Sequence, residues 1–267
     1  MNRMIRHELK TGFKPFIFWM LGLAFLTLGG MFKITGFDAT SGVDINVLFA
    51  QFPRIILAML GISNVDIQTL GGFYSVLENY VLIITAIFAI YLGSHAVSRE
   101  MIDKTYEFIF TKPRTRTTIL FTKLLTAFVY LFAFCLFNLL FSFAALRLYG
   151  IENTISLTIV YYALASLIVG LIFFSLAAVL SASFSRSEMG MKLSNAVMIV
   201  VFILSVFFDL EENPGLIQLF TPLRYFTARD LIAGHFDLVY LAVSLGLSAI
   251  FILFAFAVFK RKDLKAV

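Results

Sequence analysis

The sequence of 267 residues is 60% hydrophobic and only 14% charged, and Phe alone occurs 32 times. In soluble domains about a quarter of all residues are charged, because the surfaces of these domains must face water. The composition therefore excludes a water-soluble globule and predicts a chain that is solvated mostly by lipid. The formal net charge is +5, but the basic residues stand in short clusters between long apolar runs, so we expect no nucleic-acid partner.

Long apolar runs predict an all-α membrane protein with six transmembrane helices in one transmembrane domain, residues 1–267. A helix needs about 20 apolar residues to cross the hydrocarbon core of a bilayer. We expect the spans at approximately 15–34, 74–98, 119–147, 155–182, 192–209 and 238–259. A further apolar piece at 55–65 is too short to cross and is expected to lie in the membrane interface.

The segment before the first span has the pattern of an amphipathic helix. Its apolar residues share one helical face and its basic residues the opposite face: Met4, Ile5 and Leu9 against Arg3, Arg6 and Lys10. This pattern predicts an interfacial helix that lies along the inner leaflet. An ordinary basic flank of the first span is the alternative.

The distribution of Lys and Arg predicts the orientation of the chain. If both termini lie on one side of the membrane, that side holds 16 of the 21 basic residues. Segments rich in Lys and Arg stay in the cytoplasm. We therefore expect a multi-pass protein of the cell membrane with both termini in the cytoplasm.

The expected spans contain few groups that could perform chemistry. Glu78 and His95 fall near the ends of the second span, and no acidic residue is expected deep inside a span, where catalysis or ion coupling would need one. The chain has a single cysteine, Cys135, which excludes an intrachain disulfide. The sequence also lacks a His-x-x-x-His pair, which would have indicated a metal site. We expect no catalytic residues, no metal and no bound cofactor.

The connection between the second and third spans, residues 98–123, is longer than a tether needs to be. Four of its apolar residues fall on one face of a helix: Ile102, Tyr106, Ile109 and Phe110. Glu107 lies off this face, and Pro113 cannot continue the helix. A short helix with an apolar face needs either a partner groove or the membrane interface.

At this connection the sequence resembles the permeases of ABC-2-type exporters. That family has an acidic residue, then Gly-Thr, a Glu, a Pro and a basic residue before the next span. The matching residues are Glu100, Thr105, Glu107, Pro113, Arg116 and Lys123, whereas Lys104 replaces the glycine. The order of basic N-terminal segment, six spans and long second-to-third connection is also similar to the family.

The resemblance implies a permease subunit that is not itself an enzyme. Its partners would be a cytoplasmic ABC ATPase subunit, which binds ATP and Mg, and a second permease copy or a homologue. The chain has no G-x-x-x-x-G-K-[ST] phosphate loop, so another chain must supply the nucleotide site. Residues 102–110 would form the coupling helix, with Glu107 as a polar anchor, although a helix that contacts only lipid is an alternative.

Other function classes stay open at this stage: an ion- or proton-coupled secondary carrier, a channel, or a membrane-embedded enzyme. The transported substrate cannot be predicted from the spans, although their aromatic, apolar character weakly favours a hydrophobic or amphipathic cargo.

Two further patterns concern the second half of the chain. The segment 209–237 contains Pro214, Gly215 and Pro222 between apolar residues, which predicts short external helices. By resemblance these would be re-entrant half-helices at an outer gate, and a capping loop is the alternative. Small residues at four-residue spacing on the fourth span, including Ser166, Gly170, Ala177 and Ser181, predict close helix packing within the chain or in a dimer.

Overall fold

The computed structural model describes residues 2–37, 49, 51–63, 65–102, 115–150, 153–184, 186, 188–211 and 215–261. Within these ranges the chain is helical, and no strand occurs. Six helices are long and apolar enough to cross a membrane: α1 (Asn2–Phe37), α4 (Leu70–Ile102), α6 (Arg116–Leu148), α7 (Ser156–Ser183), α8 (Met189–Leu210) and α10 (Leu238–Arg261). The predicted fold class, an all-α membrane protein with six spans, is confirmed.

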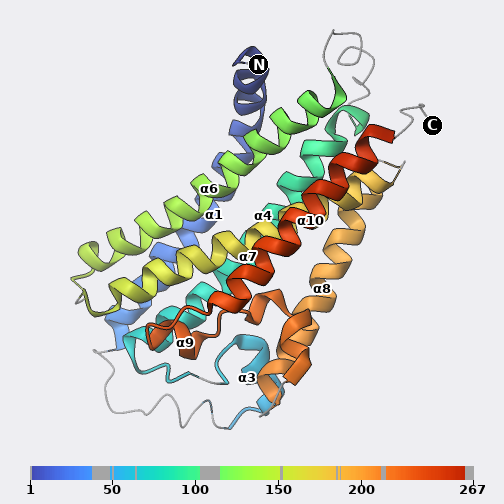
Figure 1. The fold of residues 1–267 in the computed structure, drawn as a ribbon. Coiled ribbons are helices and arrows are strands. Elements are labelled where there is room, and N and C mark those ends of the chain that lie inside the picture. Colours follow the sequence, from blue (N-terminus) through green and yellow to red (C-terminus); the bar gives the residue numbers. More distant parts are fainter. Residues whose placement is uncertain are drawn as a thin grey trace.

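The short helices gather at one end of the bundle (Figure 1). They are α3 (Arg54–Leu60), η2 (Asn153–Ile155), η3 (Gly215–Phe220), η4 (Pro222–Arg224) and α9 (Ala228–Ile232). The start of α1 and the end of α10 lie at the opposite end of the bundle. We call the end with the short helices the outer end and the other the terminal end. The expectation of short helices in 209–237 agrees with η3, η4 and α9, whereas their depth in a bilayer stays a prediction.

The N-terminal segment is not separated from the first span. Residues 2–37 form one continuous helix of 36 residues that includes Pro15. Proline lacks the backbone N–H that the preceding turn would accept, so it permits a bend without ending the helix. Figure 1 shows the first turns of α1 inclined differently from the rest of the helix. The amphipathic segment is thus continuous with the first span, and its place at the membrane interface stays a prediction.

The helices α4 and α7 pack closely because small residues lie where they cross. A Cβ atom added to Gly93 would lie 2.2 Å from the carbonyl oxygen of Phe174 and 3.2 Å from the Cβ of Ala177. At Gly190 of α8, an added Cβ would lie 2.3 Å from the Cα of Ser181. The small residues that the sequence places on α7 at 177 and 181 therefore serve packing within the chain.

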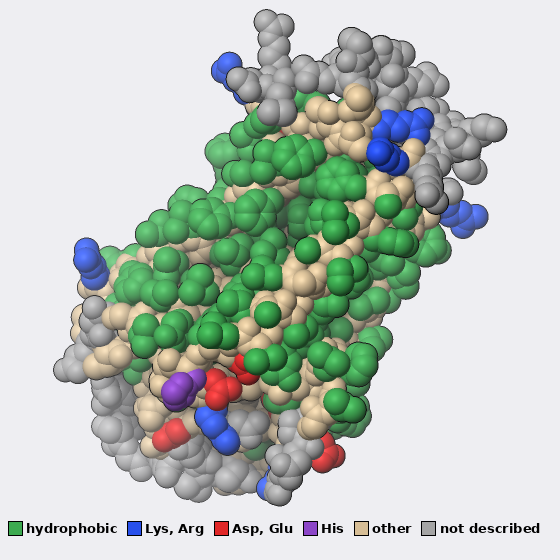
Figure 2. Space-filling view, viewed as in Figure 1, with side chains coloured by type: hydrophobic (Ala, Val, Ile, Leu, Met, Phe, Trp, Pro, Cys, Tyr) green, Lys and Arg blue, Asp and Glu red, His purple; other side chains and the backbone are tan. Residues whose placement is uncertain are grey.

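The polar and apolar surfaces are sorted along the bundle. Large apolar side chains are exposed along the outer faces of α1, α8 and α10, for example Phe25, Ile203 and Leu253. Figure 2 shows a hydrophobic middle of the molecule, with charged side chains near the two ends. This arrangement matches a bilayer whose hydrocarbon core is about 30 Å thick.

The α4–α7 crossing provides a test of the fold. Gly93→Ala is expected to lower the melting temperature of the purified protein in detergent, since the added methyl group meets a backbone carbonyl that cannot rotate away. Overpacking of this kind costs about 1–3 kcal/mol. The matched control is Gly29→Ala on α1, where nothing lies within 4 Å of the added Cβ. Equal melting temperatures for the two variants would contradict this packing.

Candidate functional site

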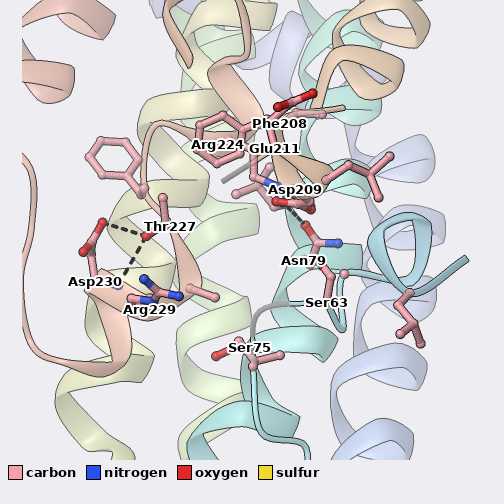
Figure 3. Close-up of a pocket in the computed structure, with 18 of the residues that line it drawn as sticks. Ser63, Ser75, Asn79, Phe208, Asp209, Glu211, Arg224, Thr227, Arg229 and Asp230 are labelled. Atoms are coloured by element: carbon pink, nitrogen blue, oxygen red, sulfur yellow. Dashed lines mark hydrogen bonds and ion pairs between the residues drawn. The ribbon is translucent and has the colours of Figure 1, made fainter. Parts of the chain in front are cut away.

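A cavity of about 680 Å³ lies at the outer end of the bundle. The outer parts of α4, α7 and α8 form its walls together with α3, η4 and α9. Its volume is in the range of small-molecule sites in proteins, about 300–1,000 Å³. We call this cavity the outer pocket (Figure 3).

Arg224 joins three elements at one wall of the outer pocket. Its Nε donates to Asp209 Oδ1 at 3.0 Å, and its Nη2 donates to Asp209 Oδ2 at 2.5 Å. Its Nη1 donates to Asn79 Oδ1 at 2.7 Å. The side chains of Arg224 and Asp209 are only 14% and 9% exposed. This two-point pairing of guanidinium and carboxylate is a strong geometry, and it fastens η4 to the outer ends of α8 and α4.

Local hydrogen bonds hold Arg224 in place. Pro222 begins η4, and Thr221 before it donates its hydroxyl to the carbonyl oxygens of Ile217 and Gln218. The Gln218 side chain in turn donates to the carbonyl oxygen of Arg224 at 3.1 Å, and the Tyr225 hydroxyl donates to that of Leu219 at 2.6 Å. Burial raises the pKa of Tyr225 above its usual value, so its phenol stays a neutral donor. The segment is therefore folded onto itself.

A second group of polar side chains borders the outer pocket on α9. Thr227 caps this helix: its Oγ1 accepts from the backbone N–H of Asp230 and donates to Asp230 Oδ2 at 2.6 Å. Arg229 stands beside them, exposed at the rim of the pocket. Figure 3 shows Thr227, Arg229 and Asp230 apart from the cluster of Arg224, Asp209 and Asn79. The pocket thus has one internally paired wall and one rim with exposed charges.

Glu78 corrects a prediction from the sequence. It is the ninth residue of α4 and is completely buried, so an acidic side chain does lie inside a span. The side-chain amide of Asn138 on α6 donates to both carboxyl oxygens, at 3.1 and 3.0 Å. Thr27 on α1 donates to Asn138 Oδ1 at 3.0 Å. This network joins α1, α4 and α6 through polar side chains inside the bundle.

A smaller cavity of about 240 Å³ lies at the terminal end between α1, α4 and α6. Charged and titratable residues of all three helices line it, including Glu8, His95, Arg99 and Lys123. The Tyr130 hydroxyl donates to the carbonyl oxygen of Leu9, and the ring of Tyr130 lies against Gly12. A polar cavity therefore lies beside the ends of α4 and α6 that the 98–123 connection joins.

Most of the predicted coupling residues lie outside the described residues. These are Thr105, Tyr106, Glu107, Ile109, Phe110 and Pro113. Glu100 and Ile102 belong to the last turn of α4, Arg116 is the first residue of α6 and is exposed, and Lys123 is buried. The predicted coupling helix, its docking face and its polar anchor all stay predictions.

Sequence reasoning missed Asp209, Arg224 and Asn79 as site residues. The sequence did place Asp209 at the end of an expected span and Arg224 in the segment that follows, with Pro214 and Gly215 between them. That pattern permits an ion pair, but it does not identify the partner of either charge. Asn79, 145 residues from Arg224, gave no signal of its own.

The fold and its cavities define a multi-pass membrane protein with a polar site at each end of an apolar helical bundle. The profile of the ABC-2 family transporter protein matches residues 3–264, and the chain therefore belongs to this family of membrane transport permeases. The resemblance in the 98–123 connection and the layout is confirmed at the level of the family. No curated protein matches the chain.

The ion pair of the outer pocket can be tested by a double-mutant cycle. Arg224→Gln is expected to destabilise the protein, because it leaves the largely buried Asp209 carboxylate without its cation. Loss of one partner of a buried pair costs up to about 3–5 kcal/mol, less here because the pair is partly exposed. The double variant Asp209→Asn with Arg224→Gln is expected to be more stable than Arg224→Gln alone, as measured by thermal unfolding in detergent. Arg147→Gln, at the same end but outside the pocket, is the control. Additive effects of the two substitutions would contradict the pairing.

Proposed function

We propose that the chain is the permease subunit of an ATP-driven exporter. A separate cytoplasmic ATPase subunit, which binds ATP and Mg, would drive it. The observation that carries this proposal is the match to the ABC-2 family transporter protein over residues 3–264. The exporter role, the ATPase partner and a second permease copy go beyond the family match and form the content of the proposal.

The terminal end of the bundle is proposed to face the cytoplasm. The start of α1, the end of α10 and the helix ends that flank the α4–α6 and α7–α8 connections lie there. The sequence has 16 of its 21 Lys and Arg residues in these segments, which agrees with the bias of cytoplasmic segments toward positive charge. The outer pocket then opens on the opposite side of the membrane.

Two long helices could carry motion between the proposed ATPase contact and the outer pocket. The helices α4 and α6 have 33 residues each, which corresponds to about 50 Å at a rise of 1.5 Å per residue. Asn79 of α4 lines the outer pocket, and Arg99 of the same helix lines the cavity at the terminal end. A displacement of the connection 98–123 would therefore move a rigid element that ends in the outer pocket.

The buried carboxyl group of Glu78 favours a second candidate function, an ion- or proton-coupled carrier. Ionisable side chains inside a membrane often mark ion pathways. In this protein, however, Glu78 is hydrogen-bonded to Asn138, and Asn138 to Thr27, which also gives it a role in holding three helices together. The two candidates differ in their dependence on an ATPase chain.

The test is co-expression of the permease with a candidate ABC ATPase subunit. Tyr106→Asp with Phe110→Asp is expected to reduce co-purification of the ATPase at least tenfold, because charges on the apolar face would prevent docking in an apolar groove. ATPase retained per permease is measured by quantitative immunoblot after purification in mild detergent.

The control replaces an apolar aromatic residue elsewhere. Phe25 of α1 is 83% exposed in the apolar middle of the bundle, and Phe25→Ala is expected to leave co-purification unchanged. Unchanged ATPase association in the loop variant would contradict the coupling role. Substrate transport by the purified permease without any ATPase would instead support the carrier.

A further inference from the structure

We propose that the outer pocket binds a small amphipathic molecule whose polar head carries both an anionic and a cationic group, as a phosphocholine head does. The inference deepens the proposed function by naming a class of ligand at the exit side of the transport path. Only the assignment of the ligand to the transport path rests on the proposed function. Binding to the pocket itself requires neither ATP nor a partner chain.

The charges that line the pocket are balanced. Three arginines and three acidic residues contribute to it: Arg54, Arg224, Arg229, Asp209, Glu211 and Asp230. Arg224 and Asp209 neutralise each other through their ion pair. The rim then retains two cations, Arg54 and Arg229, and two anions, Glu211 and Asp230. A simple anion would meet two carboxylates at this rim and a simple cation two guanidinium groups, so a head with both charges fits best.

The rim charges are available to a ligand. Arg54, Arg229 and Glu211 are exposed, and among the described residues their side chains have no hydrogen-bond or ion-pair partner. Asp230 is also exposed and uses one carboxyl oxygen, Oδ2, to accept from Thr227. Arg229 and Asp230 are adjacent on α9, so opposite charges stand side by side on one wall of the pocket.

Along α4 the lining of the pocket changes from polar to apolar. Ser75, Asn79 and Leu82 of α4 line it in this order from the outer end inward, over about 10 Å of helix. Leu82, Leu223 and Phe226 are buried. A ligand with its charged head at the rim would therefore place an apolar portion against this floor.

The location and the volume agree with an amphipathic ligand. Asp209 is the second-last residue of α8, a helix of 22 residues that is about 33 Å long. If α8 spans the bilayer, the charged wall is expected at the level of the lipid head groups. The cavity of about 680 Å³ holds a drug-sized molecule or a head with a short chain.

The experiment measures how probes protect a cysteine in the pocket from alkylation. The native Cys135 is buried and is replaced by Ala, and Ser63, which lines the pocket, is replaced by Cys. The full chain is purified in dodecyl maltoside, whose head is uncharged. The rate of alkylation by N-ethylmaleimide is followed by mass spectrometry with increasing hexylphosphocholine, hexyl sulfate or hexyltrimethylammonium, which share the same chain.

Hexylphosphocholine is expected to protect Cys at position 63 at a concentration at least tenfold lower than either singly charged probe. Arg229→Gln and Asp230→Asn should each raise the half-protecting concentration of hexylphosphocholine about tenfold. Each substitution removes one charge of the adjacent Arg229 and Asp230 pair, and so the partner of one charge of the ligand head. Arg147→Gln, exposed at the outer end but outside the pocket, is expected to leave it unchanged. Thermal unfolding of each variant checks that the fold is retained.

Three results would overturn the proposal: equal protection by all three probes, stronger protection by a singly charged probe, or no protection at all. An equal loss of protection in Arg147→Gln and the two pocket variants would also overturn it. None of these outcomes depends on ATPase association, so a failure here is distinguishable from a failure of the proposed function.

Discussion

The structure depends on one constraint: the hydrocarbon core of a bilayer offers no partner for a hydrogen bond. Backbone groups must therefore be paired within helices, and polar side chains must find partners inside the bundle or lie near its ends. The six long helices of the chain satisfy the first requirement. The contacts of Glu78 with Asn138 and of Asn138 with Thr27 meet the second requirement for these three side chains. On the face that Figure 2 shows, the charged side chains lie near the two ends, and charged residues line the pocket at each end.

This sorting of charge gives the protein two chemically distinct ends connected by stiff elements. At the outer end, Arg224 ties η4 to α8 and α4. At the terminal end, Lys123 and Arg99 line a small polar cavity beside the connection of α4 and α6. Close packing at Gly93 leaves no room for a larger side chain between α4 and α7. A bundle built in this way can relay a displacement from one end to the other, which is what a permease driven by a separate motor subunit requires.

Sequence reasoning predicted what depends on local composition. Six apolar runs were enough for the helical class, and the 98–123 motif together with the layout was enough for the family. Contacts between distant residues could not be predicted. The sequence placed Glu78 at the edge of a charge-free run, but α4 begins at Leu70, and the carboxyl group is satisfied by a residue 60 positions away. The Arg224–Asp209 pair depends on how η3 and η4 turn between them. The N-terminal segment is continuous with the first span because Pro15 is accommodated within α1, and its position along the inner leaflet stays a prediction.

The central claim is that nucleotide binding by a partner ATPase changes the outer end of this chain. It is tested most directly by pulsed electron–electron double resonance between spin labels at positions 63 and 228, on the two sides of the outer pocket. The measurement compares the assembled permease–ATPase complex with and without trapped ATP, in the Cys135→Ala background. The account predicts a shift in the distance distribution on ATP binding that is lost in the Tyr106→Asp, Phe110→Asp variant. An unchanged distribution in a complex that hydrolyses ATP would contradict it.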